Sequence, residues 1–264
     1  MSAFSWSFVF CLMLFSMPAS AETSLEFGGV AGHFHYEESS SSGDRLNRES
    51  GVLPGLYGAF VYRLPLGEWF KVSATRYSGD VLYEGQSQSG VPLRSRSDAA
   101  LWFADATAGW RGVTHSHLIF VPMVRLGFRE WQRDILPTDF TRKLSENYRW
   151  FELGVGGSLC YPERVGWLDS LCAEGWAIYT FDGSVKVDLT ELGAGQPKLR
   201  LGARPGAAIR FLATVGSLEF SLFGQFWKFG SSQPESIDWS SGKLVIEEPA
   251  SQSWLAGLSL GFQF

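Results

Sequence analysis

Few side chains in this sequence could perform acid–base chemistry, and they are widely spaced. The sequence contains four histidines: His33, His35, His115 and His117. A histidine that contacts a carboxylate can take a proton from water and activate it for hydrolysis. The carboxylates that could assist such a hydrolase are Asp80, Glu84 and Asp182. His35 beside Ser39 could instead promote attack on an acyl ester. A histidine among strand aromatics is more often a surface girdle residue, and we favour that interpretation.

No other spacing that is typical of a chemical site occurs. The sequence has no metal-ligand pattern, no phosphate-binding glycine loop and no G-x-S-x-G nucleophile elbow, so it predicts no metal and no cofactor. Its net charge of −5 argues against nucleic acid as a partner. The role of the remaining charged side chains depends on the elements that position them, and the clearest element is the end of the chain.

The last eleven residues, 254–264, alternate with a period of two. One set is apolar and has an aromatic residue at each end: Trp254, Ala256, Leu258, Leu260, Phe262 and Phe264. The other set is mostly small or polar: Leu255, Gly257, Ser259, Gly261 and Gln263. This pattern predicts a strand with an apolar outer face and a crowded or wet inner face.

Alternating segments of this kind recur along the whole chain. We expect ten strands, at 25–38, 51–63, 68–80, 98–111, 115–133, 146–160, 168–182, 198–212, 217–230 and 252–264. Connections after the odd-numbered segments are long and polar, and those after the even-numbered segments are short. A soluble β-sandwich shares the period but would not turn Phe and Leu outward on nearly every strand. We therefore predict an all-β fold, a closed antiparallel up-and-down transmembrane β-barrel of ten strands, with eight or twelve left open because strand boundaries are imprecise.

The terminal strand resembles that of Gram-negative outer-membrane β-barrels. The resemblance implies that the barrel assembly machinery of that membrane reads its last residues, here Leu258, Leu260, Phe262 and Phe264. Ten strands are also the architecture of omptins, the surface proteases that place a carboxylate pair opposite an Asp–His pair. Here one wall offers Asp80 and Glu84. The other wall offers Asp182, which Gly183 and Ser184 follow without a histidine. Omptin proteolysis is therefore not carried over to any residue.

If the apolar set faces lipid, a large group of charged side chains lies inside the barrel. We expect these to be Lys71, Asp105, Arg111, Arg125, Arg129, Glu152, Glu174, Arg200, Arg204, Arg210 and Glu219. Eight strands leave an interior that side chains just fill, so ten strands filled with Arg, Glu and Trp predict a plugged lumen. We favour an ion-pair network that fixes the register over the lining of a narrow pore, because buried charges persist only when they are paired.

Cys160 and Cys172 are equidistant from Gly166, at the centre of a predicted turn. In an antiparallel hairpin this symmetry places the two residues opposite each other. Both lie near the periplasmic end, in an oxidising compartment. We predict a cross-strand disulfide, with two free buried thiols as the alternative.

Residues 1–21 carry no charged side chain and contain a short apolar run that ends in Ala19-Ser20-Ala21. This pattern predicts a cleaved signal peptide, although the segment lacks an early Lys or Arg. Residues 22–264 would then form one barrel domain in the cell outer membrane.

The favoured function is that of an integral barrel without enzymatic activity, which contributes to envelope structure or binds an unknown extracellular ligand. The expected partners are outer-membrane lipid, lipopolysaccharide and the assembly machinery. Candidate contact surfaces are the first, second and fifth outer loops, Glu37–Glu49, Tyr83–Arg96 and Ser231–Glu248. An omptin-like hydrolase and a narrow solute channel are the alternatives.

Overall fold

The protein is described by a computed structural model that covers residues 21–86, 90–110, 112–115, 117–139, 141–239 and 242–264. The predicted signal peptide, apart from residue 21, lies outside these described residues, and so does Arg111. No helix within the described ranges is long and apolar enough to cross a membrane.

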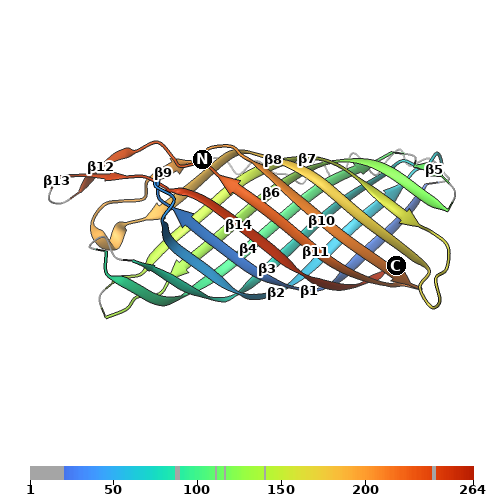
Figure 1. The fold of residues 1–264 in the computed structure, drawn as a ribbon, viewed down its shortest axis with the longest axis horizontal. Coiled ribbons are helices and arrows are strands. Elements are labelled where there is room, and N and C mark those ends of the chain that lie inside the picture. Colours follow the sequence, from blue (N-terminus) through green and yellow to red (C-terminus); the bar gives the residue numbers. More distant parts are fainter. Residues whose placement is uncertain (1–20, 87–89, 111, 116, 140, 240–241) are drawn as a thin grey trace, which may run out of the picture.

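Ten antiparallel strands close into a tube, which confirms the predicted barrel. They are β1 (Glu22–Ser39), β2 (Arg45–Arg63), β3 (Trp69–Gln86), β4 (Pro92–Gly109), β6 (Leu118–Ile135), β7 (Leu144–Tyr161), β8 (Ser170–Asp188), β10 (Pro205–Val215), β11 (Leu218–Phe229) and β14 (Ala250–Gln263). Each pairs with two neighbours, because β8 pairs with β10 and β14 pairs with β1. Figure 1 shows the strands tilted around an elongated tube.

Shorter elements extend the tube at its ends. β5 (Val113–His115) pairs with β6, and β9 (Lys198–Arg200) pairs with β8. A 3-10 turn, η1 (Thr190–Leu192), lies in the connection from β8 to β9. β12 (Glu235–Trp239) and β13 (Gly242–Ile246) form a separate hairpin between β11 and β14. In Figure 1 this hairpin extends from the end of the tube opposite the carboxyl terminus.

The carboxyl terminus completes the closure. The Leu25 amide donates to the Phe264 carbonyl at 3.1 Å, and the Phe264 amide donates to the Leu25 carbonyl at 2.9 Å. Every edge is therefore paired, which a strand in hydrocarbon requires because lipid cannot satisfy backbone groups. The end that carries the carboxyl terminus and the short turns is assigned to the periplasm, as in other outer-membrane barrels.

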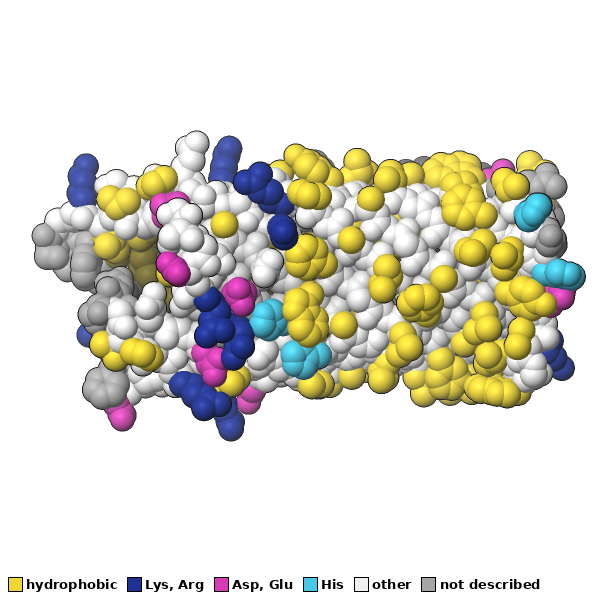
Figure 2. All heavy atoms as spheres, in the orientation of Figure 1, with side chains coloured by type: hydrophobic (Ala, Val, Ile, Leu, Met, Phe, Trp, Pro, Cys, Tyr) yellow, Lys and Arg dark blue, Asp and Glu magenta, His cyan; other side chains and the backbone are white. Residues whose placement is uncertain are grey.

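The outward face of the strands is apolar over much of their length. Its large exposed side chains include Leu25, Phe27, Leu56, Phe70, Trp102, Phe120, Leu126, Leu153, Phe211, Leu222, Leu258 and Phe262. Figure 2 shows hydrophobic side chains spread over the part of the wall to the right, and charged side chains gathered beyond them to the left. The apolar belt is the surface that hydrocarbon would cover, and the charged part extends beyond it.

Several strands run further toward the extracellular end than the sequence predicts. β2 begins at Arg45, β3 continues to Gln86 and β4 begins at Pro92. The first outer connection is therefore 40–44, and most of the first two predicted loops is strand. These extensions keep the period of two, with Val81 and Tyr83 buried. Their outward residues are mostly polar because this part of the wall lies beyond the apolar belt, and a polar outward face resembles a loop in sequence.

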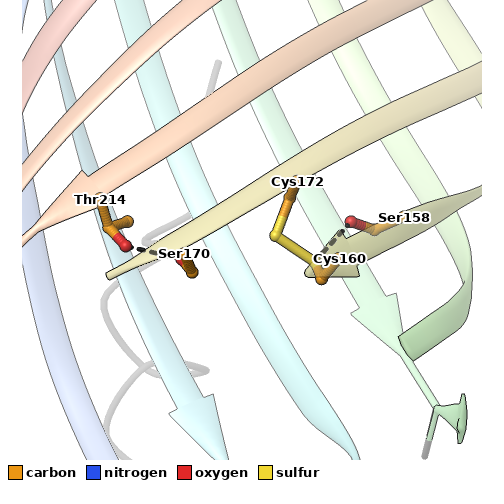
Figure 3. The surroundings of a disulfide bond; sticks show 5 residues. All are labelled: Ser158, Cys160, Ser170, Cys172 and Thr214. Carbon is orange, nitrogen blue, oxygen red and sulfur yellow. Dashed lines mark hydrogen bonds between the residues drawn. A yellow bond between two sulfur atoms is a disulfide. The ribbon is translucent and has the colours of Figure 1, made fainter. Parts of the chain in front are cut away.

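The predicted disulfide between Cys160 and Cys172 is confirmed. The two residues are register partners on β7 and β8, and their sulfur atoms are bonded. Figure 3 shows the bond between the two strands, with Ser158 beside Cys160 and a hydrogen bond between Ser170 and Thr214 on the next strand pair. The disulfide thus joins β7 and β8 at their periplasmic ends.

Protein extracted without reductant should therefore resist thiol alkylation at Cys160 and Cys172, and both should react after reduction. The bonded residues are separated by 12 positions, and a loop of roughly 15 residues contributes about 3 kcal/mol in the chain-entropy model. A C160S/C172S variant should lose up to this amount of unfolding free energy, measured by urea titration in micelles. Alkylation of both thiols without reduction would contradict the assignment.

Candidate functional site: the charged lumen and its extracellular mouth

The periplasmic half of the lumen holds separate ion pairs. Lys71 on β3 pairs with Glu26 on β1, and Arg210 on β10 pairs with Glu219 on β11 at 2.7 Å. A cavity of about 160 Å³ lies among these groups, and Glu174 lines it. Glu26 was not among the expected lumen residues, although its alternation with Leu25 and Phe27 in the sequence is the signal that would have placed it inside.

A neutral cluster of four charges crosses the middle of the lumen. Arg129, fully buried, contacts Asp105 at 2.7 Å and Glu152 at 2.9 Å. Arg125 lies 3.6 Å from Asp105 and 3.4 Å from Glu152. Arg129 also donates to the carbonyl of Ala104 at 3.3 Å. Two cations thus face two carboxylates, so the cluster carries no net charge.

Aromatic side chains close the tube directly above this cluster. The indoles of Trp150 and Trp227 both donate to Oε1 of Glu152. The guanidinium of Arg129 lies over the ring of Phe103, 4.7 Å from its centroid. These side chains belong to a continuous buried core that also contains Phe34, Tyr77, Leu101, Trp131, Phe229 and Leu255. The lumen is therefore packed like a protein interior at this level.

A second charged cluster lies at the extracellular mouth, and Arg133 on β6 is its centre. Arg133 contacts three buried glutamates: Glu38 at 3.0 Å, Glu49 at 3.0 Å and Glu146 at 2.5 Å. Three aromatic rings surround its guanidinium. The distances from its Cζ to the ring centroids are 5.0 Å for Tyr36, 5.1 Å for Trp131 and 5.3 Å for Tyr148. A fourth carboxylate, Glu248, reaches Tyr36 and Tyr148 from the connection before β14.

Sequence reasoning missed the four glutamates of this mouth cluster because Glu49 and Glu248 were assigned to loops, and Glu38 and Glu146 stood at the very ends of predicted strands. The signal was present as alternation with a buried tyrosine or asparagine, as in Tyr36-x-Glu38, Asn47-x-Glu49 and Glu146-x-Tyr148. For Glu248 there was no such signal, because it belongs to a segment that folds back over the barrel end.

Most of the expected lumen charges lie inside the described barrel: Lys71, Asp105, Arg125, Arg129, Glu152, Glu174, Arg210 and Glu219. Arg200 and Arg204 do not, since both are exposed. A change of phase between β9 and β10, where Leu199 and Leu201 occupy the inner face, turns Arg200 outward, and Arg204 lies in the connection just before β10. The expectation for these two arginines was wrong.

The hydrolase candidates do not converge. Asp80 is exposed and pairs in register with Asp98, whereas Glu84 forms ion pairs with Arg48 and Arg94. Asp182 is exposed on β8, whose neighbours β7, β9 and β10 carry none of the other candidates.

His35 lies on the outer wall of β1, away from those carboxylates. Its Nε2 is 3.9 Å from Glu37, and its ring stacks on Trp254 with centroids 5.4 Å apart. His33 stacks on the same indole at 5.1 Å. Histidine side chains are visible in Figure 2 at the boundary between the apolar and charged parts of the wall. This geometry is that of an interfacial aromatic cluster.

A groove of about 670 Å³ marks the outer wall beyond the apolar belt. Its charged lining residues are Asp80, Asp98, Asp134, Glu146, Arg149, Lys186, Asp188 and Lys198. On its basic side Lys186 and Lys198 are direct register partners, and Arg200 follows on β9. No group of three or more His, Cys, Asp or Glu side chains among the described residues is arranged to hold a metal ion.

No protein-family model matches the sequence, and no curated protein matches it. The structure is similar to the crystal structure of the outer membrane protease OmpT from Escherichia coli, with a TM-score of 0.59 and 9% identity over 94% of this chain and 98% of that one. A major outer membrane protein of Thermus thermophilus has a TM-score of 0.41 and 10% identity, over 91% of this chain and 99% of that one. The toluene transporter TodX of P. putida has a TM-score of 0.30 and 11% identity, over 94% of this chain and 91% of that one.

At these identities the likeness to OmpT shows the fold alone, and the two weaker matches carry no argument. The chain has the fold of a ten-stranded outer-membrane β-barrel with buried charged residues inside.

Replacing Arg129 with methionine should destabilise the barrel strongly. The change leaves Asp105 and Glu152 with Arg125 as their remaining cation, and breaking a buried ion pair in this way costs about 3–5 kcal/mol. Arg149→Met is the matched control: its side chain is 57% exposed and pairs with Glu130, so its loss should cost no more than about 1 kcal/mol. Urea unfolding in micelles measures both, and equal losses would contradict a structural role for the cluster.

Proposed function

We propose that this protein is a closed, non-conducting barrel of the outer membrane that acts through its extracellular surface rather than through its lumen. The observation that carries the proposal is the closure of the tube at its middle. There the Arg129–Glu152 ion pair is enclosed, and the indoles of Trp150 and Trp227 cover it. A solute would have to separate a buried ion pair and displace two indoles in order to pass.

Export and assembly follow from the two ends of the chain. Residues 1–21 would direct secretion and be removed. β14 and the residue after it present an apolar outer face, made of Leu258, Leu260, Phe262 and Phe264. This face is available to the assembly machinery before β1 pairs with the strand. These two features support residence in the outer membrane.

The basic side of the outer-wall groove fits the anionic headgroups of lipopolysaccharide. Lys186 and Lys198 lie directly opposite each other on β8 and β9, an arrangement that costs free energy unless a negative charge lies between them. Within the described part of the chain, neither lysine nor Arg200 has an acidic partner at ion-pair distance. Phosphate groups at the outer leaflet surface would supply the missing negative charge.

An extracellular ligand would meet surfaces that differ from the loops expected from the sequence. Of the three candidate loops, Glu37–Glu49 and Tyr83–Arg96 are largely barrel wall, whereas Ser231–Glu248 contains the β12–β13 hairpin. The hairpin and the connection from β8 to β10 are therefore the main surfaces offered at the extracellular end. A hydrolase gains no support from Asp80, Glu84, Asp182 and His35, which lie apart.

In planar lipid bilayers the purified barrel should show no discrete current openings. A W150G/W227G variant should conduct, because it removes the two indoles above the Arg129–Glu152 pair. Trp102→Gly is the control, since Trp102 is exposed on the outer wall and its loss should leave the barrel closed. Openings in the unmodified protein that change with Arg125→Gln would instead support the solute channel.

The triple variant K186Q/K198Q/R200Q should bind phosphorylated lipopolysaccharide less tightly than the unmodified barrel, since each surface cation near an anionic lipid surface contributes about 1 kcal/mol. Lys243→Gln, on the exposed β13, is the control and should bind normally. Co-purified phosphate per barrel and binding in nanodiscs measure the effect. Equal binding by the triple variant and the control would exclude this surface as the lipid contact.

A further inference from the structure

Residues 231–239 and 242–249, which we call the latch segment, cover the extracellular mouth. Its Ile237, Leu244 and Ile246 pack against the continuous buried core that also contains Leu189, Leu199 and the lumen aromatics. Near its end, the Glu248 amide donates to Ser232 Oγ at 2.8 Å, and the Glu248 carbonyl accepts from the Ser232 amide at 2.9 Å. The Glu248 carboxyl group is thereby directed down into the barrel, where it is buried.

The hydrogen atoms around this carboxyl group do not balance if it is ionised. Tyr36 Oη lies 2.9 Å from Glu38 and 3.2 Å from Glu248. Tyr148 Oη lies 2.9 Å from Glu146 and 2.6 Å from Glu248. Each phenol has one hydrogen, so two hydrogens serve four phenol–carboxylate contacts. Two of these contacts would then join lone pairs, and a proton on a carboxyl group supplies the hydrogen for one of them.

The charges at the mouth are also unbalanced. Arg133 is shared by Glu38, Glu49 and Glu146, and Glu248 adds a fourth carboxylate. The groups that face Glu248 are Tyr36 and Glu38 on β1, Arg133 on β6, and Glu146 and Tyr148 on β7. Glu49 on β2 and Tyr83 on β3 belong to the same cluster through Arg133. Four ionised carboxylates around one guanidinium would leave three uncompensated negative charges in a buried site.

We propose that Glu248 carries a proton at neutral pH, and that this proton holds the latch segment on the barrel mouth until alkaline solution removes it. The protonated carboxyl group donates its hydrogen to the Tyr148 oxygen, 2.6 Å away, which leaves the Tyr148 hydrogen for Glu146 and the Tyr36 hydrogen for Glu38. When hydroxide takes the proton, Glu248 becomes an anion beside Glu38 and Glu146, and the repulsion favours release of the β12–β13 hairpin. The device would gate access to the mouth cluster, whether or not the lumen below conducts.

The direction of the pH dependence follows from the protonation of the closed form. Glu248 lies in the connection between β13 and β14, and burial raises its pKa well above the ordinary value of 4.5, with the charges of Glu38 and Glu146 raising it further. The closed form therefore binds the proton more tightly than the open form. Closure is most stable below pH 4.5, weakens as the pH rises above that value, and reaches its minimum once the raised pKa is passed.

Amide hydrogen exchange of the β12–β13 hairpin tests this proposal, with the full chain in nanodiscs between about pH 5 and about pH 9. After correction for intrinsic base catalysis, the hairpin's protection should fall as the pH rises. The fall should be about tenfold for each pH unit between the ordinary and the raised pKa of Glu248. Glu248→Gln keeps a neutral donor beside Tyr148 and should make the protection independent of pH. Glu247→Gln removes the neighbouring exposed carboxylate and should follow the unmodified protein.

Protection that does not vary with pH in the unmodified protein, or that falls equally in Glu248→Gln, would overturn the proposal. Infrared spectroscopy of the unmodified protein gives a second test that needs no variant to fold. A protonated carboxyl band should be present at neutral pH and disappear over the range in which the hairpin loses protection. A band that is absent, or that titrates separately from the hairpin, would also overturn it.

Discussion

The structure depends on one constraint: lipid surrounds the wall, so every charge within the belt must be enclosed and must find its partner inside. A strand allows this because successive side chains point to opposite faces. Arg125 and Arg129 project inward from β6 while Leu126 and Phe128 project outward between them. The same strand therefore creates the membrane surface with one set of residues and fills the lumen with the alternate set.

The balance of charge varies along the tube in a physically consistent way. In the middle, two arginines face two carboxylates, and near the periplasm Lys71 and Arg210 each pair with one glutamate while Glu174 lines the same cavity. At the extracellular mouth, four glutamates share Arg133. An excess of one sign is tolerable only where a proton can enter from solvent, because a carboxyl group in a dry site neutralises rather than remaining as an unpaired ion. The acidic excess thus lies at the end where solvent is nearest and where a covering segment can move.

The sequence predicted the strand alternation, the strand number and the disulfide, because each depends on the period of two or on symmetry about a turn. It could not predict partners across the tube, such as Arg133 on β6 with Glu49 on β2, since no local pattern connects residues on opposite walls. It also failed where the phase changes: Asp182 has a φ of 49° on β8, and the inner face passes to Leu199 and Leu201 before β10 begins. Those irregularities turned Arg200 to the outer face and left Arg204 exposed in the connection before β10.

The same geometry limits what can be concluded from the likeness to OmpT. A shared strand tilt and number determine where a side chain at a given level of the barrel points, but not which residue it is. At 9% sequence identity, the residue types differ at almost every position. In this chain the lumen below the mouth is filled by Trp227, Trp150 and the Arg129–Glu152 pair, and Arg133 and its glutamates lie buried above them, beneath the covering hairpin. Any chemistry or binding at the cell surface must therefore involve the outer wall, the covering hairpin or that acidic mouth.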